Sequence, residues 1–286
     1  MSERYRTWLF APADRPDRCR KALASAADQV IWDLEDAVAP GRAAEARTAL
    51  AELLADPGTL GGRRPWVRIH SPLTDDGRRD LEELAPYAAT PARWVVPKAD
   101  GASVAALEEA ARRAPRPGEW LFVVESARGL WDLADPGQAG RWHRLGPVRL
   151  ALGAMDLRLD LGMTPDPEEL DILWARTALV WLSRVHGLPP PVDTPCPVLR
   201  GPEVAASARR AHALGFAGKL VIHPAQVEVV HAAFAPSPEE EAWARAVVAA
   251  AERSGGSAVQ AAGEMVDRPV LERARAILDR TGEGPT

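Results

Sequence analysis

Short apolar segments that end in a charged or titratable residue recur along the chain. They occupy residues 30–36, 66–70, 94–98, 121–125, 150–156 and 220–223. Most are followed by a stretch with helical periodicity, and continuous apolar runs are typical of parallel strands that are buried on both faces. The alternation therefore predicts a series of βα units.

The pattern contains eight such units. Strands are expected at residues 7–11, 29–35, 66–70, 93–98, 120–125, 148–153, 191–194 and 219–222, and a long helix is expected to open at 165–169. Eight units with right-handed crossovers favour a closed (β/α)₈ TIM barrel in the α/β class. An open doubly wound sheet usually has a glycine-rich turn after its first strand, and residues 11–16 contain no glycine.

The chain continues past the predicted barrel domain, residues 1–236, into a C-terminal extension, residues 237–286. Ser237 with the Pro-Glu-Glu that follows predicts a helix start, and a last amphipathic helix is expected at 269–280. Gly255 and Gly256 predict a hinge between these helices, and 258–265 is expected to be weakly structured. A hinge followed by a helix outside a closed barrel is typical of a lid.

Composition narrows the class of protein. The 286 residues carry a net charge of −5, which argues against non-specific nucleic-acid binding. Cys19 and Cys196 lie far apart and predict no disulfide framework, so a reducing compartment is expected. No segment approaches the roughly 20 apolar residues of a membrane span. We therefore expect a cytoplasmic protein without nucleic-acid or membrane partners.

In a barrel of this kind the carboxyl ends of the strands converge on one face, which carries the active site. Glu125 and Asp156 are expected at the ends of consecutive strands, where two carboxylates repel each other unless a proton or a cation lies between them. Mg²⁺ commonly takes one or two protein carboxylates, whereas no His/Cys set has zinc spacing. The alternative is that each carboxylate pairs with a nearby Arg or Lys.

Two cations share the same expected mouth. Arg68 lies between Val67 and Ile69, so it can grip a ligand carboxylate with both arms of its guanidinium or pair internally with Glu35 or Asp36. Lys98 can form a Schiff base, but nearby carboxylates keep an amine protonated and favour an ion pair.

Two further positions have a functional and a structural interpretation. His223 ends the last predicted strand and can serve as a base, although a single His at such a position is more often held structurally by hydrogen bonds. Arg15 lies on the first βα loop, where phosphates often bind, or it is an ordinary surface Arg.

Taken together, eight motifs resemble those of citrate lyase β-subunit-like proteins. They are LFAPADRP, DLEDAVAP, WVRIHSP, VPKA, VESARG, GAMDL, IHPAQ and MVDRP, in this order from residue 6 to about residue 270. This group belongs to the HpcH/HpaI aldolase superfamily, whose relatives include malyl-CoA and citramalyl-CoA lyases. The resemblance implies a TIM barrel, homotrimers or hexamers, and coenzyme A as part of the substrate.

The resemblance also implies roles for individual residues. Glu125 and Asp156 would hold Mg²⁺, and Arg68 would grip the carboxylate of a 2-oxo acid. Arg15 would lie near the CoA phosphates, and Asp267 would be a general acid/base delivered to a neighbouring subunit's barrel. Glu35, Asp36 and Lys98 would be catalytic residues in supporting positions.

The chain departs from the family pattern at two positions. Ala13 stands where a glycine is usual, which can narrow the turn near the ligand phosphates, and His70 stands where Asn is usual. The expected activity is a Mg²⁺-dependent carbon–carbon lyase that acts on citramalyl-, malyl- or citryl-CoA. The alternatives are a metal-dependent 2-oxo acid aldolase without CoA, and a citrate lyase subunit that works only with an acyl-carrier partner.

Overall fold

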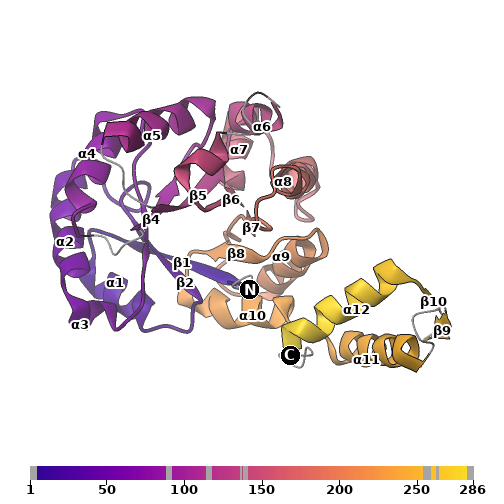
Figure 1. The fold of residues 1–286 in the computed structure, drawn as a ribbon. Coiled ribbons are helices and arrows are strands. Elements are labelled where there is room, and N and C mark those ends of the chain that lie inside the picture. Colours follow the sequence, from indigo (N-terminus) through magenta and orange to yellow (C-terminus); the bar gives the residue numbers. More distant parts are fainter. Residues whose placement is uncertain are drawn as a thin grey trace. The chain divides into compact units, whose positions relative to one another are not determined.

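Eight parallel strands close into a barrel, whose strands are labelled in Figure 1. Each strand is hydrogen-bonded to the next, and β8 is hydrogen-bonded to β1. The computed structural model describes residues 5–87, 92–113, 118–135, 137, 141–253, 259–261 and 264–281. The barrel strands are β1 (Thr7–Pro12), β2 (Gln29–Asp33), β3 (Trp66–Arg68), β4 (Ala92–Val96), β5 (Gly118–Val124), β6 (Val148–Leu152), β7 (Val192–Asp193) and β8 (Gly218–Val221). The predicted TIM barrel is confirmed.

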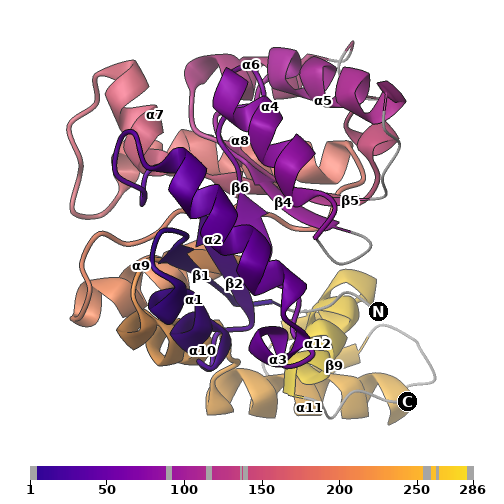
Figure 2. The same ribbon diagram turned by 90° about the vertical axis from the view of Figure 1, so that its left-hand side faces the viewer.

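Helices surround the barrel, and Figure 2 shows α2 and α4 packed together on its outside. They are α1 (Pro16–Leu23), α2 (Ala43–Ala55), α3 (Pro57–Leu60), α4 (Asp75–Leu84), α5 (Gly101–Arg113), α6 (Ala127–Ala134), α7 (Ala154–Leu161), α8 (Leu173–Val185), α9 (Pro202–Ala213) and α10 (Val227–Phe234). Short 3₁₀ turns are η2 (Trp142–Leu145), η3 (Leu170–Ile172) and η4 (Pro224–Gln226). Among the described residues no helix is both long and apolar enough to span a bilayer.

Alternate residues of the strands fill the barrel interior. Ile31, Trp66 and Val123 belong to one buried apolar cluster that also contains Trp8, whose ring lies 5.2 Å from that of Trp66. Successive strand residues point to opposite sides, so residues two positions further along point the same way. The interior is therefore sealed by apolar side chains, and Asp33, Arg68 and Glu125 follow directly above them at the carboxyl ends of β2, β3 and β5.

The segment after β6 differs from the sequence prediction. Residues 165–169 do not open a helix, which is an error of the prediction, because Glu169 takes a left-handed backbone conformation at φ 59°. The helix α8 begins only at Leu173, and a separate helix, α7, precedes this segment. Because β6 ends at Leu152 and α7 begins at Ala154, Asp156 lies in the first turn of α7 and not at the end of a strand.

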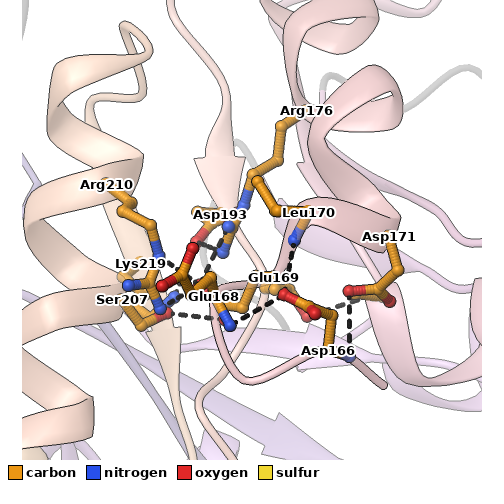
Figure 3. Close-up of polar contacts among 12 residues, drawn as sticks. Asp166, Glu168, Glu169, Leu170, Asp171, Arg176, Asp193, Ser207, Arg210 and Lys219 are labelled. Carbon is orange, nitrogen blue, oxygen red and sulfur yellow. Dashed lines mark hydrogen bonds and ion pairs between the residues drawn. The ribbon is translucent and has the colours of Figure 1, made fainter. Parts of the chain in front are cut away.

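A buried ion-pair network explains the unusual backbone at Glu169, and Figure 3 shows its side chains converging between α8, α9 and β7. Arg176 of α8 donates to both carboxylate oxygens of Asp193 at 2.9 Å, and Lys219 donates to Asp193 at 2.6 Å. Glu169 accepts from Arg176 at 2.9 Å and from Arg210 at 2.9 and 3.0 Å. The network thus ties the segment before α8 to the outside of the barrel.

We expect Glu169 to make the fold sensitive to acid. Burial alone would raise its pKa, but hydrogen bonds and charges, chiefly from Arg176, outweigh burial and lower the pKa to about 2 from 4.5. A depressed pKa stabilises the fold fully above pH 4.5, and this stabilisation, roughly 3 kcal/mol, is lost as pH falls toward 2. Urea unfolding between pH 7 and pH 3 measures the loss. Wild type should lose more stability than Glu169→Gln, and parallel losses would contradict the assignment.

The chain forms two compact units, Met1–Ala233 and Phe234–Thr286. The second unit contains α11 (Pro238–Arg253), α12 (Arg268–Thr281) and an antiparallel pair, β9 (Val259–Ala261) with β10 (Glu264–Val266). Its helices bury Val247 and Ile277 against each other. Residues 258–265, expected to be weakly structured, therefore contain strands. The predicted hinge glycines, Gly255 and Gly256, lie outside the described residues.

Candidate active site

Arg68 is the centre of a buried charge cluster at the carboxyl end of the barrel. Its Nε and Nη2 donate to the two oxygens of Asp33 at 2.6 and 2.5 Å. Its Nη1 lies 3.0 Å from Glu35 and 3.2 Å from Asp36. Burial opposes the charged form, yet the neighbouring carboxylates, Asp33 foremost, raise the pKa of Arg68 further above its usual value. The guanidinium is therefore permanently charged, and all three of its nitrogens contact carboxylates of this chain.

Lys98 connects two carboxylates of the cluster. Its ammonium lies 3.0 Å from Glu35, and its backbone N–H donates to Oε1 of Glu125 at 2.7 Å. The residue takes a left-handed conformation, φ 48°, that costs a non-glycine residue on the order of 1 kcal/mol or more. Burial lowers the pKa of Lys98, but the hydrogen bond to Glu35 and nearby carboxylates raise it overall. Lys98 is thus held as an ammonium ion, as its expected ion-pair role requires.

Glu125 is the least solvated carboxylate of the expected metal pair, at 4 % exposed. Burial, followed by the charges of Glu35 and Asp156, raises its pKa to about 8. A Cβ added at Gly153 would lie 2.2 Å from Oε2 of Glu125, so glycine is required for the close approach. Asp156 lies in the first turn of α7, and its negative charge is close enough to contribute to the raised pKa of Glu125.

The electrostatic balance at the mouth favours a bound cation. Within the described residues, five carboxylates gather here against the two cations Arg68 and Lys98; they are Asp33, Glu35, Asp36, Glu125 and Asp156. One oxygen of Glu35 is buried and accepts no hydrogen bond, although it lies within ion-pair distance of Arg68. Among the described residues, no three or more His, Cys, Asp or Glu side chains are placed so that they could hold a metal ion by themselves. This donor set suits Mg²⁺, which needs few protein carboxylates and completes its shell with water and substrate oxygens.

Three other expected site residues, Arg15, His223 and Asp267, make their described contacts outside this charge cluster. Arg15 is exposed after β1 and lies 3.4 Å from Asp17. The Nδ1 atom of His223 accepts the N–H of Ala225 and caps η4, so its structural interpretation is confirmed. Asp267, in the second unit, accepts the N–H of Val270 and caps the start of α12.

Position 70, where the chain departs from the family pattern, has a buried acidic partner. His70 contacts Oδ2 of Asp80 through both its backbone N–H, at 2.8 Å, and its Nδ1, at 2.7 Å. The hydrogen bond to Asp80 raises the pKa of His70. Asp80 in turn accepts from the buried Arg47 at 2.7 Å. The loop that follows Arg68 is therefore anchored on α4 and α2.

Asp33 is the functional candidate that the sequence pattern missed. It is 1 % exposed and accepts backbone N–H groups of Glu35 and Ala37 as well as the Arg68 fork. The available signal was its spacing, because Asp33 precedes Glu35 by two positions in an acidic segment at a strand end. Asp33 thus orients both Arg68 and the turn that presents Glu35.

A family model described as HpcH/HpaI aldolase/citrate lyase matches residues 6–224. The chain belongs to the HpcH/HpaI aldolase/citrate lyase family. A second model, described as a C-C bond lyase of the TIM-barrel fold, matches residues 205–282. The two matches together extend over both compact units.

Members of the HpcH/HpaI family resemble this chain along nearly its whole length. The citrate lyase subunit beta-like protein of Mycobacterium tuberculosis is 38 % identical over 281 residues, which cover 96 % of this chain and 95 % of the relative. Human mitochondrial citramalyl-CoA lyase is 30 % identical over 285 residues, 94 % of this chain and 83 % of the relative. These relatives indicate a CoA-related carbon–carbon lyase family.

A solved structure shows what one family member binds. CitE from Mycobacterium tuberculosis, in complex with magnesium, acetoacetate and coenzyme A, is similar with a TM-score of 0.79 and 36 % identity. The match covers 99 % of this chain and 100 % of CitE. The fold is thus shared with a member that carries a metal ion, an oxo acid and CoA together.

Proposed function

We propose that this protein is a Mg²⁺-dependent lyase that cleaves or forms a 3-hydroxy-carboxyacyl-CoA such as citramalyl-, malyl- or citryl-CoA. The products of cleavage are a 2-oxo acid and an acyl-CoA. The observation that carries the proposal is the surplus of carboxylates around the buried Glu125, which a divalent cation would relieve. The magnesium, acetoacetate and coenzyme A bound by CitE support the same substrate class.

Glu125 and Asp156 are the proposed metal ligands. When bound, Mg²⁺ supplies Lewis-acid stabilisation of negative charge and a template for the oxo-acid fragment. The backbone N–H of Lys98 fixes one oxygen of Glu125 and leaves the other, Oε2, beside Gly153. The ammonium of Lys98 pairs with Glu35 at 3.0 Å and partly offsets the negative charge of that neighbouring carboxylate.

Arg68 is the proposed carboxylate-binding residue. Its Nε and Nη2 edge is taken by Asp33, whereas Nη1 contacts the Asp36 carboxylate, whose side chain is 58 % exposed. Nη1 also lies 3.0 Å from the largely buried Glu35. A substrate carboxylate would therefore replace only Asp36 at Nη1, because an exposed ion pair contributes little stability. Asp33 then acts as the clamp that keeps the guanidinium aimed at the substrate.

The second unit completes the proposal. Asp267 is the proposed general acid/base that protonates the thioester enolate after cleavage or removes a proton in condensation. We propose that residues 237–286 act as a lid, because an enolate is protected when water is excluded. Arg15 is the proposed contact for the CoA phosphates, and the chain is proposed to form homotrimers or hexamers.

The proposed reaction is tested by incubating the purified protein with malyl-, citramalyl- and citryl-CoA and Mg²⁺. At least one thioester should be cleaved to a 2-oxo acid and an acyl-CoA, and Asp267→Asn should reduce kcat by roughly 10²–10⁴, the usual contribution of a general acid or base. Mg²⁺ affinity should be unchanged in that variant.

Two outcomes of this experiment would identify other functions. Cleavage of free 4-hydroxy-2-oxo acids to a 2-oxo acid and an aldehyde, tested alongside and without CoA, would indicate a 2-oxo acid aldolase. Cleavage only after addition of an acyl-carrier protein would indicate a citrate lyase subunit. Wild-type turnover that survives Asp267→Asn unchanged would contradict the role of that residue.

A further inference from the structure

The two proposed metal ligands are positioned in different ways. One oxygen of Glu125 accepts the backbone N–H of Lys98 at 2.7 Å. The carboxylate of Asp156 has no hydrogen-bond or ion-pair partner in the part of the chain that the structure describes. Asp156 is the third residue of α7, so its position depends on the backbone at the start of this helix.

The start of α7 is capped by a residue from a different βα unit. The first four N–H groups of a helix have no partner within the helix. Gly153 stands at the N-cap and has no side chain to accept one of them. The hydroxyl oxygen of Thr194, 40 residues away in sequence, accepts the N–H of Ala154 at 3.0 Å. Both residues are buried, so the N–H would be left without a partner if this hydroxyl were removed.

Thr194 is held from one side by the residue before it. Asp193 belongs to the ion-pair network of Figure 3, where it accepts hydrogen bonds from Arg176 and Lys219. All three of these residues are buried. A buried polar network whose members are satisfied rigidifies the backbone that carries it. The network therefore fixes the end of β7, from which Thr194 extends.

Gln226 holds the chain on the other side of Thr194. Its amide nitrogen donates to the backbone oxygens of Cys196 at 2.9 Å and of Val198 at 2.8 Å. Its amide oxygen accepts the N–H of Ile222, just after β8, at 2.9 Å. Gln226 is itself buried, and it thus ties the loop after Thr194 to the end of the neighbouring strand.

A helix cap of the ordinary kind occurs at α4, where no proposed metal ligand follows. The Thr74 hydroxyl accepts the N–H of Gly77 at 3.1 Å, within the start of its own helix. Thr74 is exposed, whereas Thr194 is buried and held on both sides. Mg²⁺ requires nearly ideal octahedral geometry with ligand oxygens at about 2.0–2.1 Å, so a small shift of α7 would weaken the metal site before it unfolded the helix.

We propose that Thr194 positions Asp156 for magnesium by fixing the first turn of α7. Thr194 is a positioning residue, because its hydroxyl bonds the helix and not the metal. Asp193 and Gln226 in turn hold Thr194 in place. The inference rests on the proposed role of Asp156 as a metal ligand, and it adds a residue beyond the metal ligands on which Mg²⁺ affinity depends.

Replacing Thr194 by Val tests this proposal, because Val has a similar shape and lacks the hydroxyl. Isothermal titration should show Mg²⁺ binding roughly 10- to 100-fold weaker than in wild type, the usual effect of removing a group that orients a metal ligand. The Mg²⁺ concentration for half-maximal turnover should rise by the same factor. The kcat at saturating Mg²⁺ should stay within a few-fold of wild type, since bound metal favours the positioned helix. Thr194→Ser keeps the hydroxyl and should restore the affinity.

The matched control is Thr74→Val, which removes the helix cap of α4. It should lower the unfolding temperature and leave Mg²⁺ affinity unchanged. Equal affinity in wild type and folded Thr194→Val, or equal weakening in Thr194→Ser and Thr194→Val, would overturn the positioning role alone. A wild type that binds no Mg²⁺ would refute the proposed metal ligands, and the positioning role with them.

Hydrogen exchange on the wild-type protein tests the cap without any substitution. The Ala154 amide should exchange about ten-fold or more slowly than the amide of Asp75, the first residue of α4, for which the described residues offer no acceptor. Comparable exchange at the two amides, after correction for their sequence context, would overturn the proposal even where Thr194→Val does not fold.

Discussion

Replacing Glu125 by Gln is expected to abolish magnesium binding and to reduce turnover by about 10³-fold or more. Gln keeps the size of the side chain and one oxygen for the Lys98 N–H, but it removes the negative charge that the metal needs. Metal ions contribute several kcal/mol of transition-state stabilisation, and each 1.36 kcal/mol corresponds to a factor of ten in rate. Isothermal titration with Mg²⁺ and steady-state kinetics measure the two effects separately.

The same variant should also be more stable than wild type at pH 8 when no metal is bound, whereas a simple loss of structure would make it less stable. The pKa of Glu125 is raised to about 8 from 4.5, so without metal the wild-type fold loses stability as pH rises through this window. The loss is at most about 1.4 kcal/mol per pH unit. Metal-free Glu125→Gln should therefore be more stable than metal-free wild type at pH 8, and added Mg²⁺ should stabilise only wild type.

Glu119→Gln is the matched control for this experiment. Glu119 lies on the same strand as Glu125 but near its beginning, where it pairs with Arg64 and Arg93. The control should keep Mg²⁺ affinity and turnover. Unchanged Mg²⁺ affinity in Glu125→Gln would refute the metal role.

Replacing Arg68 by Lys is expected to reduce kcat/KM by roughly 30- to 5,000-fold, which corresponds to about 2–5 kcal/mol for a disrupted buried charge pair. One ammonium group cannot contact both oxygens of Asp33 and also reach Asp36, as the guanidinium does. It also cannot reproduce the flat contact with the ring of Phe10, now 4.9 Å from the guanidinium carbon.

The control for Arg68→Lys is the same substitution at Arg93. This Arg bonds Glu119 at 3.1 Å and lies over the ring of Trp66 at 5.5 Å, away from the charge cluster. Arg93→Lys should lower the unfolding temperature and leave kcat/KM within a few-fold of wild type. Comparable kcat/KM in Arg68→Lys and wild type, with both folded by circular dichroism, would show that Arg68 is only structural.

The sequence predicted the barrel well because its local signals agree with its tertiary structure. The apolar runs at residues 29–35 and 120–125 are strands because the barrel buries both of their faces. The expected helix at 165–169 failed because Glu169 is drawn into contact with Arg176 and Arg210, residues that only the fold brings near it. Local helix-start chemistry was overridden by a long-range ion-pair network.

Within the site, positions were predicted more easily than partners. Strand ends place Glu35, Arg68 and Glu125 at one mouth, and this follows from the topology alone. Which acid holds Arg68 does not follow, because Asp33, Glu35 and Asp36 are all within reach in sequence. The choice depends on side-chain alternation and on the exact strand end, and the structure gives the bidentate contact to Asp33.

Lys98 contacts one carboxylate through its backbone and another through its side chain, so a substitution at this position would affect the two contacts differently. The contact to Glu125 comes from the peptide N–H, which every residue except proline retains, whereas the contact to Glu35 depends on the amine. Substitutions at position 98 would therefore remove the ion pair with Glu35, while Glu125 would still accept the backbone N–H. New substrate preferences can arise at this position without dismantling the proposed magnesium ligand.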